Sequence, residues 1–137
     1  MKLSTRGRYG LKAMFDLALH SSDEPIPLRN IAERQDISEH YLEQLISSLR
    51  KAGLVKSVRG AYGGYILAKK PREITVGDVL RALEGPCGLV DCVLEVNAQK
   101  CSKYDDCITR TVWAKIRDSM IKTAEPITLE DMCNSAK

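Results

Sequence analysis

The sequence is poor in aromatic residues and in histidine. It contains one Phe, one Trp, five Tyr and two His among 137 residues. Both histidines, His20 and His40, precede every cysteine, and neither is close to a cysteine in the pattern. A nucleophilic cysteine needs a base such as histidine within hydrogen-bond reach. The sequence therefore disfavours a cysteine-dependent enzyme, and we expect no catalytic activity.

The sequence also lacks a long apolar run. A membrane-spanning helix needs about 20 consecutive apolar residues, and no stretch approaches that length. The N-terminal residues interleave Lys2, Arg6, Arg8 and Lys12 with polar residues, so they do not form the apolar core of a signal peptide. We therefore expect a cytoplasmic protein that does not act at a membrane.

The cysteine count is odd, because the chain contains five. In a reducing cytoplasm disulfides are rare, so these thiols favour metal binding or redox chemistry over a disulfide framework. The length of the chain allows one sizeable core, or one domain with an appendage.

Positive charge is concentrated in the first half of the chain, although the net charge is only +3. Residues 1–72 contain 13 Lys or Arg against 7 Asp or Glu, which gives +6. Residues 73–137 contain 8 against 11, which gives −3. A locally basic region is expected where a protein meets a polyanion such as DNA.

Two apolar stripes at helical spacing predict a helix-turn-helix. They cover Leu28–Ala32 and Ile37–Leu49. Asp36 falls at the turn between them, where a residue that tolerates left-handed geometry is needed, and Ser38 is a typical N-cap for the second helix. The outward side of the second helix is polar and has a size that the DNA major groove accepts. A solvated amphipathic helix would show the same polar face.

A glycine-rich hairpin follows the second helix. Leu54–Val58 and Tyr65–Ala68 are predicted strands, and the loop between them reads RGAYGG at residues 59–64. Its glycines allow the backbone to approach a phosphate, while Arg59 can enter a groove. The loop matches neither the Walker pattern nor the dinucleotide fingerprint. The ordered combination predicts a mainly α fold with a small β-hairpin wing, which is a winged helix-turn-helix.

Apolar periodicity also predicts an N-terminal helix that starts near Thr5 and ends before Ser21. Positive side chains at its start, including Arg8, could contact the DNA backbone, because helix N-termini and arginines favour phosphate. Plain surface charge is the alternative interpretation. The predicted buried face of this helix consists of Leu11, Met14, Phe15, Ala18 and Leu19.

Beyond the wing, the capping boxes Thr75-x-x-Asp78 and Thr128-x-x-Asp131 mark the starts of two helices. Between them, Val112–Ala124 carries another helical stripe. This long helix is too far along the chain to complete the winged-helix core, so we expect it to meet the same helix of a second subunit. We therefore predict a DNA-binding domain at residues 1–72 and a dimerisation region at residues 73–137. The predicted partner is double-stranded DNA with a palindromic operator.

The stretch from residue 87 to residue 107 has no clear periodicity and carries four of the five cysteines. Cys92, Cys101 and Cys107 are the candidate metal ligands, with the spacing C-x8-C-x5-C. Structural zinc sites usually combine two closely spaced cysteine pairs, which this loop lacks. The irregular gaps suit a flexible loop that folds around an iron-sulfur cluster with thiolate ligands. From the spacing alone, a cluster, a zinc ion and unligated thiols all stay open.

The motifs of the chain occur in a specific combination. They are RGRYG at residues 6–10, SEHYLEQL at 38–45, GLV at 53–55, RGAYGGY at 59–65, and the three loop cysteines followed by Thr109 and Trp113. Over nearly the whole chain, this combination resembles the Rrf2 family of bacterial winged-helix regulators. The resemblance implies a homodimer joined by the long helix, with DNA contacts from the second helix and the wing. The candidate DNA-contacting residues are Arg8, Ser38, His40, Tyr41, Glu43, Gln44, Arg59, Gly60 and Tyr62.

The loop cysteines indicate which members of the family the chain resembles. Members that bind an iron-sulfur cluster carry three cysteines here, so the resemblance implies a cluster-sensing regulator of cluster-assembly genes. It also implies that Glu43 helps to separate cluster-dependent from cluster-independent operators. A two-iron two-sulfur cluster is favoured, with a four-iron four-sulfur cluster as the alternative.

The fourth ligand of such a cluster stays open, with Cys87 of the same loop as the nearest soft candidate and an oxygen of the loop or of the partner subunit as the alternative. Cys133, beyond the long helix, is interpreted as a small apolar residue. The histidine ligand of the best-known pattern is replaced here by Arg110, and arginine cannot ligate iron. Nitric-oxide sensors of the family use an N-terminal aspartate that has no counterpart between Thr5 and Gly10. The alternatives to cluster sensing for assembly genes are a nitric-oxide or redox-sensing repressor of the same family, a small iron-sulfur electron carrier and a zinc-binding structural protein.

Overall fold

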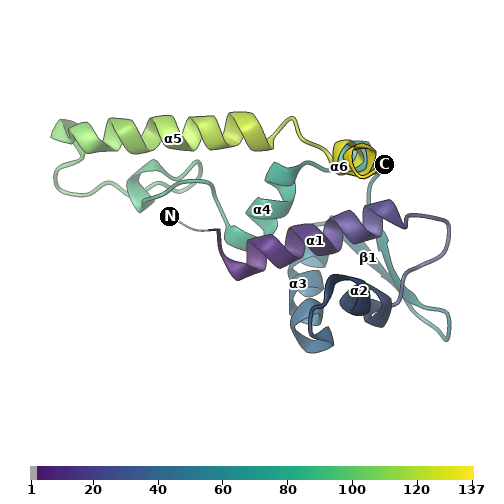
Figure 1. Ribbon diagram of the computed structural model, residues 1–137. Helices are drawn as coiled ribbons and strands as arrows, with labels where there is room; N and C mark the ends of the chain where they lie inside the picture. Colours follow the sequence, from purple (N-terminus) through teal and green to yellow (C-terminus); the bar gives the residue numbers. More distant parts are fainter. Residues whose placement is uncertain (1–2) are drawn as a thin grey trace.

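The computed structural model describes residues 3–137, which form six α-helices and one two-stranded antiparallel sheet (Figure 1). Three short 3-10 turns lie at Pro71–Glu73, Asp91–Val93 and Tyr104–Asp106. The regular elements are α1 (Thr5–Leu19), α2 (Leu28–Gln35), α3 (Glu39–Lys51), β1 (Val55–Val58), β2 (Gly64–Leu67), α4 (Val76–Glu84), α5 (Ile108–Ala124) and α6 (Leu129–Ser135).

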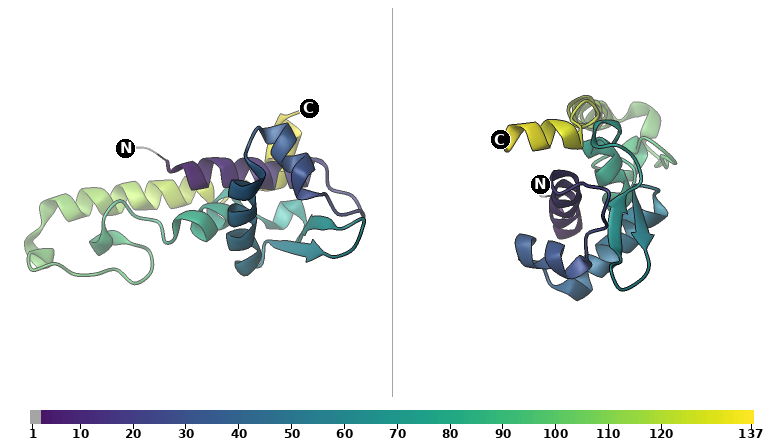
Figure 2. Two further views of the ribbon diagram at one scale, coloured as in Figure 1. Left: turned by 90° about the horizontal axis from the view of Figure 1, so that it is seen from below. Right: turned by 90° about the vertical axis from the view of Figure 1, so that its right-hand side faces the viewer.

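The elements are arranged on two sides of α1. Figure 1 shows α2, α3 and the hairpin on one side, whereas α4 lies between α1 and α5 on the other. One end of α5 projects beyond the rest of the chain, and the cysteine loop, residues 87–107, runs beside the projecting part. The left view of Figure 2 shows the same projection. The arm formed by α5 and the cysteine loop is therefore joined to the helices and hairpin around α1 through α4.

The predicted helix-turn-helix is confirmed, and local side-chain chemistry explains its turn. Asp36 adopts a left-handed conformation, with φ 52° and ψ 51°, at the end of α2. The hydroxyl of Ser38 then accepts a hydrogen bond of 3.1 Å from the N–H of Tyr41 and caps α3. Below this turn, α2 and α3 bury Ile31, Ala32, Leu42, Leu45, Ile46 and Leu49.

The predicted buried face of α1 is wrong in part. Leu11 and Phe15 are only half-buried, and Leu19 is 43% exposed. The reason is the packing of α4, which lies against a narrow glycine face of α1. A side chain at Gly7 or Gly10 would collide with the carboxylate of Glu84 or with Leu83. The buried residues of α1 are Gly7, Gly10, Ala13, Met14, Asp16, Leu17 and Ala18.

The predicted hairpin is confirmed, although β1 begins one residue later than predicted and β2 begins and ends one residue earlier. Val55 pairs with Leu67, and Val58 pairs with Gly64. The chain before α2 adds a short bridge, because the N–H of Ile26 donates to Tyr65 O at 2.9 Å and the N–H of Tyr65 donates to Ile26 O at 2.8 Å. The hairpin therefore extends the helix-turn-helix as a wing.

Both predicted capping boxes are present, at Thr75 with Asp78 and at Thr128 with Asp131. They start α4 and α6, which both pack on α1. The same core therefore contains residues from both halves of the chain, and the division at residue 72 stays a functional prediction. The second half contributes Ile74, Val79, Leu83 and Leu129 to this core.

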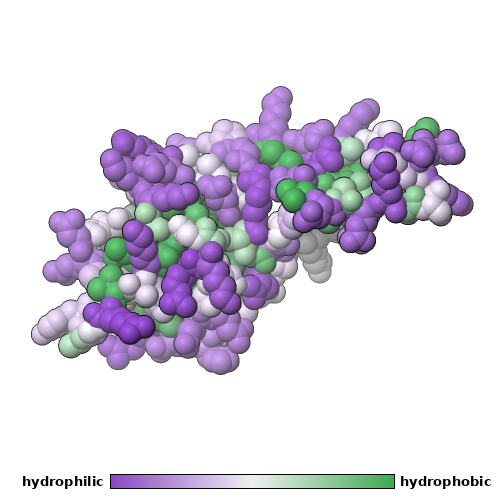
Figure 3. All heavy atoms as spheres, turned by 180° about the vertical axis from the view of Figure 1, so that it is seen from behind, coloured by the Kyte–Doolittle hydropathy of each residue, from purple (hydrophilic) through white to green (hydrophobic). Residues whose placement is uncertain are grey.

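The long helix α5 has no buried residue. Ile108 is 78% exposed and Val112 is 46% exposed, while Trp113, Ile116 and Met120 are half-buried. An apolar groove runs between α5 and α4, and in Figure 3 apolar side chains reach the surface on the arm as well as on the body. Among the described helices, none has both the length and the apolar character needed to cross a membrane.

Candidate DNA-binding surface and cysteine loop

The helix-turn-helix is fixed to α1 by a buried carboxylate that the sequence analysis missed. Asp16 has no exposed surface. Arg34 donates to Asp16 through Nη2 at 2.7 Å and through Nε at 3.0 Å, and Gln35 donates through its side-chain amide at 3.0 Å. The hydrogen bond with Asp16 raises the pKa of Arg34. Because Arg34 and Gln35 form the last turn of α2, Asp16 sets the position from which the turn to α3 begins.

The outward face of α3 is formed by polar side chains that are free to meet DNA. His40, Glu43 and Gln44 are exposed, and the side-chain nitrogens of His40 and Gln44 lie 3.4 Å apart. Tyr41 is half-buried because its ring packs edge-on against Tyr9 of α1, with 6.3 Å between the ring centroids. The face therefore presents hydrogen-bonding groups of a kind that can read base edges.

The start of α1 adds positive charge beside this face. The guanidinium of Arg8 and the ammonium of Lys12 each lie 5.3 Å from the ring of Tyr9. Since Tyr9 contacts Tyr41, the two cations are held next to the first turn of α3. Arg6 is used internally instead: its Nη2 donates to Ser48 Oγ at 2.9 Å, and its Nε donates to Leu83 O at 3.4 Å.

The tip of the wing is open to solvent. Arg59, Gly60 and Tyr62 are exposed, and Tyr62 has 93% of its surface accessible. Gly60 has φ 118°, a conformation that favours glycine, and its carbonyl accepts from the N–H of Gly63 at 3.0 Å. The tight turn therefore leaves the Arg59 side chain at the edge of the molecule, where it can reach a phosphate or a groove.

The three candidate metal ligands occupy different parts of the cysteine loop. Cys92 is half-buried in the turn Asp91–Val93, Cys101 is exposed, and Cys107 directly precedes α5. Across residues 3–137, no three His, Cys, Asp or Glu side chains converge as a metal site. Soft thiolates nevertheless suit iron, and the donor set of this loop therefore fits an iron-sulfur cluster in chemistry. The loop would have to close to bring the sulfurs of Cys92, Cys101 and Cys107 around one cluster.

Cys107 is the thiol best suited to act as a thiolate. The Thr109 hydroxyl lies 3.1 Å from its sulfur and lowers its pKa, with a smaller effect from the N–H of Arg110. Both groups belong to the first turn of α5, where free N–H groups favour negative charge.

Arg110, which replaces the expected histidine ligand, holds the loop instead. Its guanidinium lies 4.0 Å from the ring of Tyr104, and its Nε donates to Tyr104 O at 2.9 Å. The turn that contains Tyr104 is thus fixed to the start of α5. Arg110 therefore positions the segment before Cys107 and cannot itself supply the fourth ligand.

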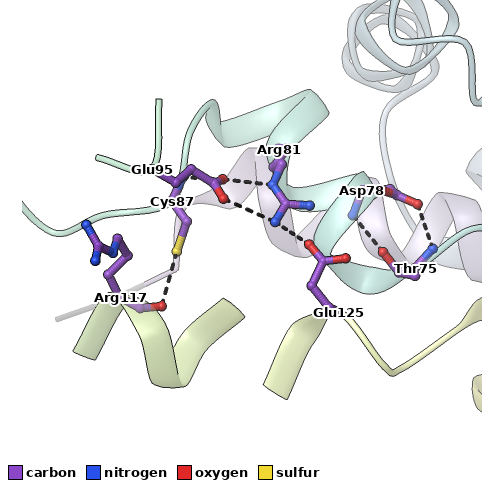
Figure 4. Close-up of polar contacts among 7 residues, drawn as sticks. All are labelled: Thr75, Asp78, Arg81, Cys87, Glu95, Arg117 and Glu125. Atoms are coloured by element: carbon purple, nitrogen blue, oxygen red, sulfur yellow. Dashed lines mark hydrogen bonds and ion pairs between the residues drawn. The ribbon is translucent and has the colours of Figure 1, made fainter. Parts of the chain in front are cut away.

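The other two cysteines lie in settings that favour the neutral thiol. The sulfur of Cys87 lies 4.0 Å from Arg117 O on α5 (Figure 4), and partial burial raises the pKa of this thiol. Cys133 packs against the core from α6, and burial raises its pKa as well. The sequence analysis interpreted Cys133 as a small apolar residue, which agrees with this packing.

The fold and the polar face of α3 define a winged-helix DNA-binding protein. The chain belongs to the Rrf2 family, because the family model described as "Iron-dependent Transcriptional regulator" matches residues 3–135. Its relatives are named as transcriptional regulators, which supports a DNA-binding role rather than a catalytic one. The HTH-type transcriptional regulator IscR of Pectobacterium atrosepticum is 44% identical over 135 residues, covering 98% of this chain and 80% of that protein.

Solved structures show the same likeness. T. potens IscR has a TM-score of 0.82 and 50% identity, covering all of this chain and 89% of that one. CymR of Bacillus subtilis is 46% identical over 134 residues, covering 98% of this chain and 91% of that protein. Its structure is described as "the Global Cysteine Regulator" and has a TM-score of 0.79, with 98% of both chains covered. The chain is therefore similar to IscR and to CymR proteins to about the same degree.

Proposed function

We propose that this protein is a dimeric transcription regulator that senses an iron-sulfur cluster and controls genes for cluster assembly. The observation that carries the proposal is the loop itself, which places three thiols between α4 and the start of α5 and gives Cys107 a lowered pKa. The likeness to IscR proteins supports the same signal. A cytoplasmic location follows from this role.

Cys92, Cys101 and Cys107 would hold the cluster, whose chemistry makes a regulator sensitive to iron supply, oxygen or nitric oxide. Gathering the three thiols would order the loop and shift the population of conformations that the recognition helices adopt. Because Arg110 cannot ligate iron, the fourth donor would be an oxygen of the loop or of the partner subunit, with Cys87 as the nearest soft alternative.

Dimerisation is proposed from the uncovered apolar side of α5. Ile108 and Val112 are exposed in a single chain, and the groove beside α4 is apolar. A second copy of α5 would cover both, and the two-fold pair would present two α3 helices to a palindromic operator.

Anaerobic purification followed by iron and sulfide analysis and a visible spectrum tests the proposed signal. Iron and sulfide in equal amounts with a charge-transfer spectrum are expected. Stoichiometric zinc without sulfide would favour a structural metal instead. Protein that binds its operator normally but takes up neither metal nor sulfide after reconstitution would favour a cysteine regulator, which the likeness to CymR supports as the second candidate.

Gln44→Ala is expected to remove sequence discrimination. An amide that makes a bidentate contact with adenine contributes about 1–3 kcal/mol, and Gln44 is exposed on the outward face of α3. Affinity for a selected operator should fall, while affinity for scrambled DNA stays the same. Gln99→Ala, which changes an exposed glutamine of the cysteine loop, is the matched control. Equal losses on both DNAs would show that Gln44 reads no base.

Arg59→Ala is expected to weaken binding to all DNA sequences. If Arg59 contacts a phosphate, its loss should reduce the slope of log affinity against log salt by about one unit. The control Arg72→Ala removes an equivalent exposed charge outside the wing and should leave the slope unchanged. A salt titration of both variants that gives the wild-type slope would exclude the wing contact.

Glu43→Ala is expected to broaden the set of operators that the cluster-free protein binds. Glu43 is exposed on α3, and its carboxylate repels phosphate and accepts only from the amino group of cytosine. Glu43 therefore acts by excluding certain DNA sites from binding. Binding-site selection with the cluster-free wild type and variant measures this, and an identical motif from both proteins would reduce Glu43 to a solvated surface residue.

A further inference from the structure

Arg81 joins three parts of the chain at one point (Figure 4). It lies in the last turn of α4 and donates to both carboxylate oxygens of Glu95 in the cysteine loop, at 2.7 and 3.2 Å. It also forms an ion pair with Glu125, which directly follows α5. A bidentate guanidinium-carboxylate pair fixes orientation as well as distance. Arg81 thus ties α4 to the loop and to the end of α5.

Glu95 closes the first part of the cysteine loop into a ring. The N–H of Cys87 donates to Glu95 Oε1 at 2.8 Å, and the N–H of Glu95 donates to Cys87 O at 2.9 Å. Cys92 lies inside this closed segment. The hydrogen bond from Arg81 lowers the pKa of Glu95, so the pair is charged at neutral pH. The position of Cys92 is therefore coupled to α4 through Glu95.

The second part of the loop is anchored on α5. Cys107 directly precedes α5, and Arg110 holds the turn at Tyr104 against the same helix. The turn that contains Cys92 is held by both helices, because Glu95 binds Arg81 of α4 and Nη1 of Arg117 on α5 donates to Val93 O at 3.1 Å, whereas Cys107 is attached to α5. A rearrangement that draws the Cys92 turn along α5 toward Cys107 would therefore strain the contact between Arg81 and Glu95.

A continuous set of contacts leads from α4 to the recognition helix. Arg6 of α1 donates both to Leu83 O at the end of α4 and to Ser48 Oγ on α3. Leu83 itself is buried in the core that α1 and α3 share. A displacement of the last turn of α4 would therefore be transmitted to α3.

We propose that the Arg81–Glu95 pair is the link through which the state of the cysteine loop reaches the recognition helix. Arg81 and Glu95 are positioning residues in this proposal, which rests on the proposed cluster-sensing function. Without the pair, the segment containing Cys92 keeps its contact with Arg117 of α5 but loses its charged link to α4. The loop can then still gather its thiols, but the recognition helix no longer responds.

Glu95→Gln tests the link with little change in shape. The amide oxygen can still accept from the N–H of Cys87, whereas the charged bidentate pair with Arg81 is lost. Glu73→Gln, at an exposed position outside the network, is the matched control. For wild type and both variants, operator affinity is measured with and without the cluster at one salt concentration. The alkylation rate of Cys92 is measured by mass spectrometry in the cluster-free proteins.

In the wild type and in Glu73→Gln, the operator affinities of the cluster-bound and cluster-free forms should differ by about 5- to 150-fold, the usual range of coupling between sites. Glu95→Gln should keep its iron content, reduce the ratio of the two affinities to below about twofold, and raise the alkylation rate of Cys92 severalfold. If Glu95→Gln retained both the wild-type ratio and the wild-type alkylation rate, the link would be overturned.

A second variant covers the case in which Glu95→Gln fails to assemble a cluster. Arg81→Lys keeps the charge but loses the fork that binds both oxygens, so the ratio should fall by at least about half. An unchanged ratio would overturn the proposal. If the wild-type protein bound its operator equally well with and without the cluster, the cluster-sensing function itself would be overturned, and with it any role for the link in sensing.

Discussion

Asp16→Ala is expected to lower the free energy of unfolding by about 2–4 kcal/mol, the largest effect on stability among the substitutions considered. The carboxylate is fully buried and accepts hydrogen bonds from Arg34 and Gln35. Removing one partner of a fully buried ion pair typically costs about 3–5 kcal/mol. Here Arg34 is about one-third exposed and can regain water, which places the expected cost somewhat lower.

Urea denaturation followed by circular dichroism measures this effect. Asp23→Ala removes an exposed carboxylate in the loop after α1 and should change stability by no more than about 0.5 kcal/mol. Because Asp16 fixes α2, its loss should also weaken operator binding at temperatures where the variant is still folded. A cost below about 1 kcal/mol would show that the pair contributes little to holding α2 on α1.

Serine at position 92, 101 or 107 is expected to abolish cluster assembly. Each substitution removes a soft thiolate, and a hydroxyl oxygen is a poor replacement for iron. Cys133→Ser should retain the cluster, because Cys133 packs against the core from α6. Cys87→Ser should retain it as well, because that thiol faces Arg117 O and its pKa is raised. Loss of the cluster in Cys87→Ser would identify Cys87 as the missing fourth ligand.

Iron and sulfide content with visible spectra, measured on all five single variants prepared without oxygen, distinguishes these outcomes. The two variants expected to retain the cluster are matched controls, because they carry the same change of sulfur to oxygen. A normal cluster in all three variants at positions 92, 101 and 107 would remove the cluster assignment.

Local signals in the sequence predicted the parts of the fold that short-range chemistry determines. Asp36 at the turn, Ser38 as a cap and the two boxes at Thr75 and Thr128 all have their cause within four residues, and the structure confirms each. Helix periodicity also predicted the stripe of α3. The glycines of α1 were different, because the reason for Gly7 lies in Glu84 of α4.

The parts that were not predicted depend on partners far away in the chain. Asp16 interrupts the apolar run of α1, which was a signal of a buried charge, but its partner Arg34 could only be recognised once α2 was placed. The same holds for Arg81 and Glu95, which lie fourteen residues apart on two different segments. The sequence predicted three thiols in one loop, whereas the attachment of this loop to α4 and α5 required the structure.

The most direct test of the cluster-sensing account is the operator affinity of the wild-type protein, measured anaerobically with the cluster bound and after its removal, at one fixed salt concentration. The account predicts that the two forms differ by about 5- to 150-fold on at least one selected operator. Equal affinities of the two forms for every operator recovered by selection would contradict it.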